Sequence, residues 1–481
     1  MRTPVMESRV HRLSLLVVLC STQFLNTVNL SSVNIALPDI AAGLRFGESN
    51  LPWVVTAYAL TFGGFLLVGG RVADVVGRRK VLAFGFAVFG AFTLIDALAA
   101  NPAMLIAARG LQGVGAAFSI PAALGILTNT FTGRDERSRA VGAFAAAGAV
   151  GFASGLVLGG VVTDALGWRW VFGLTAPPVA ALLAMTFVLV PSDREESRAR
   201  GRVDLPGALS ATAGLLGIVF ALTNAGEAGL APVTLIPLAG GLSLLGLFLF
   251  LQARGREPLM PLHLWRRPNF AAVMAVAFFL YACWVGVTFF LALTLQEVLG
   301  YTPTGAALAL LPLTIGGVIG STIAGRAMPR TGAKLLMVLG LFLYVAGIAL
   351  TAFINTDSTY WFYIFTAISL IAVGCPLTFV SANVTALADA APHEQSLVGG
   401  LFNTGVQVGG GLGVAVMSAA SAAVISVDAS GDALLPGYQA AFWIAVVIAT
   451  LGLLVALFLV REPTAKAPVS GTTRDSECPT S

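Results

Sequence analysis

This sequence is poor in charge. Only 10% of its 481 residues are Asp, Glu, Lys or Arg, whereas 57% are hydrophobic. Soluble domains carry about 25% charged residues, so this composition excludes an ordinary water-soluble protein, and lipid must be the solvent of most of the chain. The formal net charge of +4 gives no indication of a nucleic-acid partner.

Cysteine and histidine are also scarce. The four cysteines lack the spacing of a disulfide framework, and the three histidines all fall outside the apolar segments. No Ser/His/Asp arrangement, zinc pattern or phosphate-binding nucleotide loop is present, so we expect no enzyme, no direct use of ATP, and no cofactor or metal. The residues concerned are Cys20, Cys283, Cys375, Cys478, His11, His263 and His393.

Long apolar windows are abundant instead. Stretches of about 20 residues, the length that crosses a bilayer core, recur fourteen times. The first is too long for a signal peptide and is interpreted as an uncleaved span. The windows predict an all-α membrane protein with spans at 13–37, 51–70, 81–100, 102–127, 139–163, 170–190, 205–224, 233–252, 270–293, 303–325, 333–354, 359–386, 397–425 and 438–460.

The basic residues assign a side to each loop. With the N-terminus in the cytoplasm, 24 of the 27 Lys and Arg residues fall in cytoplasmic segments, Arg45 and Arg169 fall outside, and Arg109 lies within a span. Cytoplasmic loops are enriched in Lys and Arg. The pattern therefore predicts a multi-pass protein of the cell (inner or plasma) membrane with both termini in the cytoplasm.

Two loops are alike: Gly69–Lys80 and Ala324–Lys334 each close the second span of an expected six-span unit. Repeated bundles that rock about a central site are a transporter design. The predicted organisation is a cytoplasmic N-terminus (1–12), an N-terminal six-helix bundle (13–190), a cytoplasmic linker (191–204), two inserted helices (205–252), a second cytoplasmic linker (253–269), a C-terminal six-helix bundle (270–460) and a disordered cytoplasmic tail (461–481).

The first of these loops resembles the signature of the major facilitator superfamily between spans two and three. Its glycines permit a tight turn, and its aspartate can pair with basic groups or cap a neighbouring helix. The resemblance implies a conformational clasp that holds the outward-open state; a solvated turn is the alternative. Val75 replaces the arginine usual after the aspartate. The matching residues are Gly70, Asp74, Gly77, Arg78 and Arg79.

Further motifs cover about residues 10–460. "RGLQGVGAA" (Arg109–Ala117) resembles the fourth-span motif, and "GFASGLVLGG" (Gly151–Gly160) resembles the fifth-span antiporter motif, whose helix-packing glycines are Gly151, Gly155, Gly159 and Gly160. "SSVNIALPDI", "GWRWVF" and "LFNTGVQVGGGLGVAV" are similar to the fourteen-span drug:proton antiporter branch, the EmrB/QacA-like exporters of drugs and antibiotics. The resemblance implies a major facilitator fold of 6+2+6 helices and a functional monomer.

Arg109 interrupts an apolar span about 7 residues, roughly 10 Å, from its start. A guanidinium in a membrane helix costs at least about 2.5–3.5 kcal/mol, so we expect it to face the bundle interior or a wet cavity. In the resembling family this arginine lies near the proton route and tunes nearby acids. Alternatively, Arg109 binds backbone carbonyls or Gln112 and serves packing alone.

The acid that the resembling branch carries in its first span is missing, because Asn29 occupies that position, and the fifth-span proline is Leu156. Both departures bear on whether transport is coupled to protons, and neither bears on the assignment as a transporter. Asp96 is the acid inside a span and Asp39 lies near the outer end of span one, so both are candidates for coupling. Each can instead serve structure, Asp96 as a hydrogen-bonding group and Asp39 as a helix cap.

Amides and aromatic residues are the candidates for a substrate cavity. Asn26 and Asn29 share one helix face, as do Asn403 and Gln407; interhelical hydrogen bonding is the alternative for both pairs. Without a carboxylate deep in the spans, the charges of a dicationic substrate would have no partner there. We therefore expect a neutral, zwitterionic or acidic lipophilic compound. For Trp284, Thr288 and Phe289 a lipid-facing or core position is the alternative. The full set is Asn26, Asn29, Asn34, Trp284, Thr288, Phe289, Asn403 and Gln407.

These observations predict a secondary active exporter of a small lipophilic drug or antibiotic that works by alternating access in exchange for protons. Two alternatives remain. Asn29 and Leu156 favour an uncoupled facilitator or uniporter of the same fold. A membrane enzyme or sensor with a transporter-like fold would need converging acids or histidines, or an added soluble domain, and the sequence has neither.

Overall fold

The computed structural model describes residues 9–47, 50–191, 204–229, 231–255, 258–388, 390, 394–425 and 431–462. Almost all of the expected linker 191–204 and of the expected tail 461–481 lies outside these ranges, as do His393 and Cys478. Within the described residues all regular structure is helical, and fourteen segments are long and apolar enough to cross a membrane. The predicted all-α fold with fourteen transmembrane helices is therefore confirmed.

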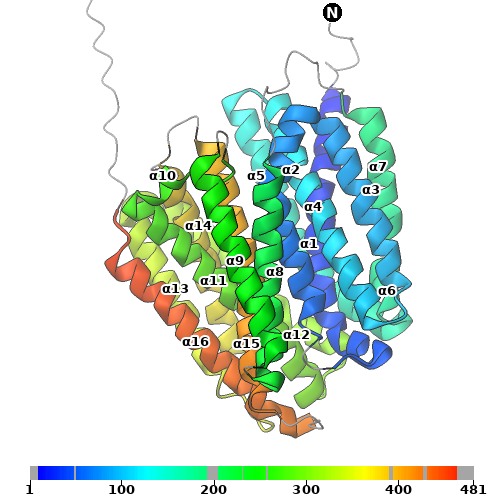
Figure 1. The fold of residues 1–481 in the computed structure, drawn as a ribbon, viewed down its shortest axis with the longest axis vertical. Helices are drawn as coiled ribbons and strands as arrows, with labels where there is room; N and C mark the ends of the chain where they lie inside the picture. Colours follow the sequence, from blue (N-terminus) through cyan, green and yellow to red (C-terminus); the bar gives the residue numbers. More distant parts are fainter. Residues whose placement is uncertain are drawn as a thin grey trace, which may run out of the picture.

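The helices follow the chain in the order of the predicted spans (Figure 1). They are α1 (Arg9–Leu44), α2 (Trp53–Val76), α3 (Arg78–Ala97), α4 (Pro102–Thr130), α5 (Arg134–Leu166), α6 (Arg169–Gly173), α7 (Ala176–Leu189), α8 (Leu205–Ala228), α9 (Pro232–Arg254), α10 (Leu262–Trp265), α11 (Pro268–Leu293), η3 (Thr294–Val298), α12 (Pro303–Thr331), α13 (Ala333–Thr351), η4 (Tyr360–Ile364), α14 (Phe365–Ala388), α15 (Gln395–Ala422), η5 (Gly431–Leu434) and α16 (Leu435–Phe458).

Several helices are longer than the apolar windows that predicted them. Helix α1 continues to Leu44 and includes Pro38, so Asp39 lies within the helix. Helix α5 extends the expected span 139–163 at both ends. The bilayer thickness sets a minimum length for a spanning helix but does not end it. The sixth span is interrupted between α6 and α7, directly before Pro177 and Pro178, which cannot donate backbone hydrogen bonds.

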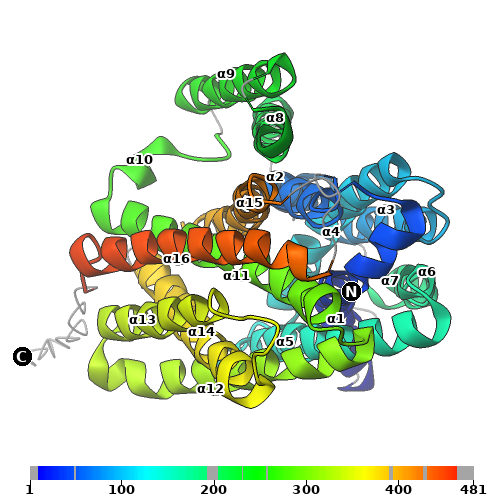
Figure 2. The ribbon, with the colours of Figure 1, turned by 90° about the horizontal axis from the view of Figure 1, so that it is seen from below.

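The helices form two groups and a separate hairpin (Figure 2). In the first group α1 packs against α5, and α4 packs against α2 and α3; in the second, α11 packs against α15, and α14 packs against α12 and α13. The groups meet where α5 contacts α12 and where α2 contacts α15. Helices α8 and α9 pack against each other, and α8 touches α2 and α15, one helix from each group.

We call the side where α1 begins and α16 ends the basic side, and the other the opposite side. Two hydrogen bonds between the groups lie toward the opposite side. Asp164 Oδ2, near the end of α5, accepts a hydrogen bond of 2.8 Å from the Thr304 backbone at the start of α12. Gln296 donates to the Ile35 carbonyl at 3.0 Å. These hydrogen bonds join the two groups near the ends of their helices on the opposite side, whereas α2 and α15 also touch farther along, where a Cβ added at Gly400 would lie 2.8 Å from Leu67.

The glycines of the fifth-span motif face neighbouring backbones. A Cβ added at Gly159 would lie 2.6 Å from Ser32 Cα, and one at Gly151 would lie 2.6 Å from the Phe24 carbonyl oxygen, both on α1. At Gly160 the neighbour is the Pro303 carbonyl oxygen of α12, 2.7 Å away. Only glycine permits this approach, so α5 lies tightly between α1 and α12.

Candidate functional site

Arg109 lies at the centre of the first helix group. Helix α4 begins at Pro102, where the Asn101 side chain accepts from the Met104 backbone at 2.9 Å, and Arg109 follows two turns later. Its side chain is 1% exposed, the largest fully buried one among the described residues. Burial is complete because three neighbouring helices surround this part of α4.

The guanidinium donates to an acceptor on each of three helices. Nε donates to the Val54 carbonyl of α2 at 2.9 Å, and Nη1 donates to Asn29 Oδ1 of α1 at 2.6 Å and to Gln112 Oε1 of α4. Arg109 therefore lies inside the bundle, as expected, and its hydrogen-bond acceptors there are a backbone carbonyl and two side-chain amides, not carboxylates. A guanidinium is not deprotonated in proteins, so Arg109 remains a cation.

Aromatic rings cover the guanidinium. Its central carbon lies 4.5 Å from the centre of the Tyr58 ring and 6.0 Å from that of Phe172. Tyr58 in turn donates to Asn26 Oδ1. The negative face of an aromatic ring attracts a cation most strongly where water is excluded. Sequence analysis did not identify Tyr58 or Phe172, because nothing in the local pattern separates them from other buried aromatic residues.

A second layer of hydrogen bonds connects α4 to α3. Gln112 Nε2 donates to Thr93 Oγ1 at 2.7 Å, and Thr93 donates to the Phe89 carbonyl at 2.7 Å. Thr93 was also absent from the predicted set. We call Asn29, Tyr58, Thr93, Arg109 and Gln112 the arginine network. It joins α1, α2, α3 and α4.

Asp96 lies one helical turn beyond Thr93. Its side chain is 0% exposed, and neither carboxyl oxygen has a hydrogen-bond partner among the described residues. Arg109 is the charged group that acts on it electrostatically. A buried carboxylate without hydrogen bonds is costly, and Asp96 lacks a partner at both oxygens, whereas Asn29 lacks one at its amide nitrogen alone.

Asp39 lies apart from this network, in the last part of α1. It is half-buried, and the charged group next to it is Asp164 of α5. The structure therefore places the two coupling candidates in different environments. Asp96 is buried in the first helix group under the electrostatic influence of Arg109, whereas Asp39 is half-buried under that of Asp164 of α5.

The cavity candidates are divided between several places. Asn34 is buried and donates to the Leu30 carbonyl at 3.1 Å. The Trp284 ring lies 6.0 Å from Phe152 of α5, at the boundary between the groups, and Thr288 donates to the Trp284 carbonyl at 2.8 Å. Phe289 is 1% exposed in the core of the second group.

The pair on α15 is more accessible. Asn403 is exposed and donates to the Gly399 carbonyl at 2.9 Å. Gln407 is half-buried where α15 meets α2, and a Cβ added at Gly63 would lie 2.8 Å from the Gln407 Cβ. These two side chains therefore belong to the boundary between the helix groups, whereas Asn26 and Asn29 are bonded within the first group.

The loop between α2 and α3 is held by its own charges. Asp74 Oδ1 accepts from Arg78 Nη2 at 2.7 Å, and Gly77 turns the chain with φ 114°. Arg79 donates to the Phe187 carbonyl of α7. A Cβ at Gly70 would have Pro121 at 3.7 Å, an ordinary contact. The ion pair of Asp74 with Arg78 and the hydrogen bond from Arg79 to Phe187 both lie within the first helix group.

Comparison with known proteins assigns the sequence of this chain to a family. The family model described as Major Facilitator Superfamily matches residues 19–414. The puromycin resistance protein pur8 of Streptomyces alboniger is 37% identical over 472 residues, covering 95% of this chain and 93% of the relative. The cephamycin export protein CmcT of Amycolatopsis lactamdurans is 37% identical over 410 residues, covering 84% and 83%.

Solved structures support the fold. A bacterial homologue of the human lysosomal transporter Spinster, in an inward-facing and unoccupied conformation, aligns with a TM-score of 0.69 at 17% identity, covering 96% of this chain and 100% of that one. The chain is a transporter of small molecules rather than an enzyme, and a multi-pass protein of the plasma membrane. By its family match and its relatives, this chain belongs to the Major Facilitator Superfamily.

Proposed function

We propose that this transporter exports a drug or antibiotic from the cytoplasm in exchange for protons. The names of two relatives at 37% identity, a puromycin resistance protein and a cephamycin export protein, support drug export. The excess of Lys and Arg supports a cytoplasmic basic side. With the helix groups joined at the opposite side, substrate would enter from the cytoplasm.

The observation that carries proton coupling is Asp96. A buried carboxyl group without hydrogen bonds, under the influence of a permanent cation, can exchange a proton when the helices move and water reaches it. In this proposal Asp96 takes the proton, and Arg109 stabilises the carboxylate after the proton leaves. The arginine network holds the guanidinium in place through α1, α2 and α4.

The cargo proposed is a neutral, zwitterionic or acidic lipophilic compound. Asp96 is completely buried, and the accessible candidates at the boundary between the groups, Asn403 and Gln407, are amides. A dication would find no carboxylate there to compensate for its lost hydration. Transport of matched dicationic and acidic dyes by the purified protein tests this; efficient export of the dication alone contradicts it.

Alternating access requires the two expected bundles, 13–190 and 270–460, to rock about this boundary. In that movement the loop containing Gly70, Asp74, Gly77, Arg78 and Arg79 acts as a clasp. Its acid and its arginines pair within the first helix group when the groups are joined at the opposite side. They would contact the second group when the basic side closes.

The test of coupling is Asp96→Asn in proteoliposomes. The variant should lose export driven by a proton gradient, by at least about tenfold, and retain counterflow of substrate, because exchange without net transport needs no net proton movement. Asp135→Asn makes the same chemical change at an exposed position of the same helix group, at the start of α5, and serves as the control. Gradient-driven export that survives Asp96→Asn would contradict the assignment.

A second candidate is an uncoupled facilitator of the same fold. The observation that favours it is the hydrogen bond from Arg109 to Asn29, an amide that cannot titrate, at the position where the resembling branch carries an acid. A pH jump separates the two functions. Substrate addition that moves protons in wild-type vesicles supports antiport, whereas transport without proton movement supports the facilitator.

A further inference from the structure

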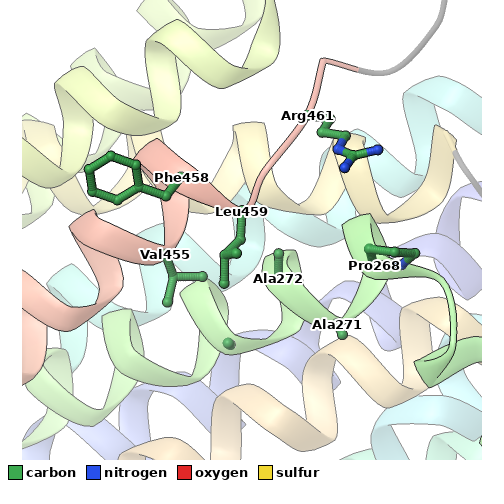
Figure 3. A pocket seen from close by; sticks show the side chains of 8 residues that line it. Pro268, Ala271, Ala272, Val455, Phe458, Leu459 and Arg461 are labelled. Carbon is green, nitrogen blue, oxygen red and sulfur yellow. The ribbon is translucent and has the colours of Figure 1, made fainter.

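A hollow of about 350 Å³ opens between α11 and α16 at the basic side (Figure 3). The start of α11 contributes Pro268 and three alanines, and the end of α16 contributes larger apolar side chains. The lining residues are Pro268, Ala271, Ala272, Ala275, Val455, Phe458, Leu459 and Arg461. This volume falls in the range of ligand-binding pockets, about 300–1,000 Å³.

The hollow exists because small side chains on one helix face larger ones on the other. From Pro268 to Ala275 it follows α11 for about 10 Å, at 1.5 Å per residue. Phe458 and Leu459, at the end of α16, are 79% and 57% exposed. In a membrane protein such apolar surface at the end of a span meets lipid acyl chains rather than water.

Arg461 supplies the single charge of the lining. It follows the end of α16, and its side chain lies on the same side as Pro268 (Figure 3). Its backbone N–H donates to Asn269 Oδ1 at 2.9 Å, which ties the segment after α16 to the start of α11. The guanidinium is therefore held at the edge of the apolar hollow, at the level where the spans end.

The neighbouring acid does not neutralise this cation. Glu462 Oε1 accepts from the Lys334 backbone at the start of α13, at 2.9 Å. Among the described residues no carboxylate forms an ion pair with Arg461. An apolar groove about 10 Å long with an exposed guanidinium at its end matches a molecule with an acyl chain and an anionic head group.

We propose that this hollow binds one anionic phospholipid of the leaflet on the basic side. An acyl chain lies against the three alanines and Leu459, and the head-group phosphate binds Arg461. Arginine suits this task because its planar fork matches phosphate oxygens in a bidentate manner. Because the site faces lipid and lies away from the arginine network, it is independent of the exported compound.

The experiment is native mass spectrometry of the full-length transporter in detergent, titrated with phosphatidylglycerol or with phosphatidylcholine of identical chains. Wild type should retain one phosphatidylglycerol in preference to phosphatidylcholine. Arg461→Gln should lower the apparent affinity for phosphatidylglycerol about fivefold, the usual contribution of one basic residue at an anionic membrane surface. Inorganic phosphate in excess should not displace the bound lipid.

Three further variants distinguish binding in the groove from general effects on the protein. Ala275→Phe fills the hollow and should abolish retention of the lipid, whereas Val447→Phe adds the same ring to a lipid-facing position of α16 and should not. Arg137→Gln removes an exposed charge from the start of α5 and should not alter binding. Equal retention of both lipids, or wild-type binding by Arg461→Gln and Ala275→Phe, would overturn the proposal.

Discussion

Arg109 illustrates how a membrane helix accommodates a permanent cation. Insertion of an arginine costs about 2.5–3.5 kcal/mol on translocon scales, and Arg109 meets this cost with carbonyl and amide acceptors on α1, α2 and α4. Two aromatic rings occupy the remaining faces. Each acceptor is itself buried, so the acceptors depend on the guanidinium as much as it depends on them.

Arg109→Lys should therefore be destabilising although the charge is kept. A single ammonium cannot reach the Val54 carbonyl, Asn29 and Gln112 in the geometry of the guanidinium fork. At least one buried acceptor loses its donor, at about 1–3 kcal/mol. Thermal unfolding of the purified variants measures the effect; Arg137→Lys, an exposed arginine, is the control. Equal melting temperatures for Arg109→Lys and wild type would contradict the network.

The sequence predicted part of this site. Arg109 and Gln112 are three residues apart on one helix, so their contact follows from helix geometry. Asn29 was expected on the cavity wall or in interhelical hydrogen bonds, and its amide oxygen accepts a hydrogen bond from the guanidinium. Tyr58, Thr93 and Phe172 could not be predicted, because their roles depend on how α2 and α3 pack against α4 and how α6 packs against α3. A single sequence carries no record of which helix faces meet.

At the scale of the helix, glycine decides how closely elements pack. Along α5, Gly151, Gly155 and Gly159 lie against α1, and Gly160 lies against α12. The motif could be recognised in the sequence, but its two partner helices could not. The spans were predicted correctly in number because hydropathy is a local property, whereas their ends were not, since the helices continue beyond the hydrocarbon.

Gly159→Val should prevent α5 from reaching α1. The new side chain would begin 2.6 Å from Ser32 Cα, a backbone atom that cannot move aside alone, and overpacking of this kind costs about 1–3 kcal/mol or more. Gly142→Val is the matched control on the same helix, because nothing lies within 4 Å of its added Cβ. The yield of monodisperse protein after purification distinguishes the two; equal yields would contradict the packing argument.

Asp164→Ala should weaken the contact between α5 and α12. The carboxylate accepts from Thr304 at the N-terminus of α12, where negative charge is worth about 1 kcal/mol. Its loss should shift the balance between conformations about fivefold toward opening at the opposite side. Distances between spin labels on α5 and α12 measure the shift.

Asp204→Ala provides the control for this shift. Asp204 accepts in the same way from the Gly207 backbone at the start of α8, at 2.9 Å, but within the hairpin. Its removal should leave the distribution of distances between α5 and α12 unchanged. If both variants, or neither, alter that distribution, the contact at Asp164 does not control the opening.

At the scale of the molecule, the distribution of charge predicts orientation. A cysteine introduced for Leu98, between α3 and α4, should react with an impermeant maleimide in intact cells. One introduced for Arg137, at the start of α5, should react only after permeabilisation. Cys478 is first replaced by serine, which leaves Cys20, Cys283 and Cys375 in the spans as the background. The reverse labelling pattern would invert the proposed direction of transport.

The two helix groups meet along two lines of contact, α2 with α15 and α5 with α12. The hairpin of α8 and α9 makes these two flanks different. One flank, where α2 meets α15, carries α8 as an additional wall. On the other flank, where α5 meets α12, α1 of the first group touches both partners, and among the described residues neither α8 nor α9 packs there. A lipophilic molecule diffusing in the bilayer therefore finds the boundary between the groups covered by α8 on one flank and not covered by the hairpin on the other.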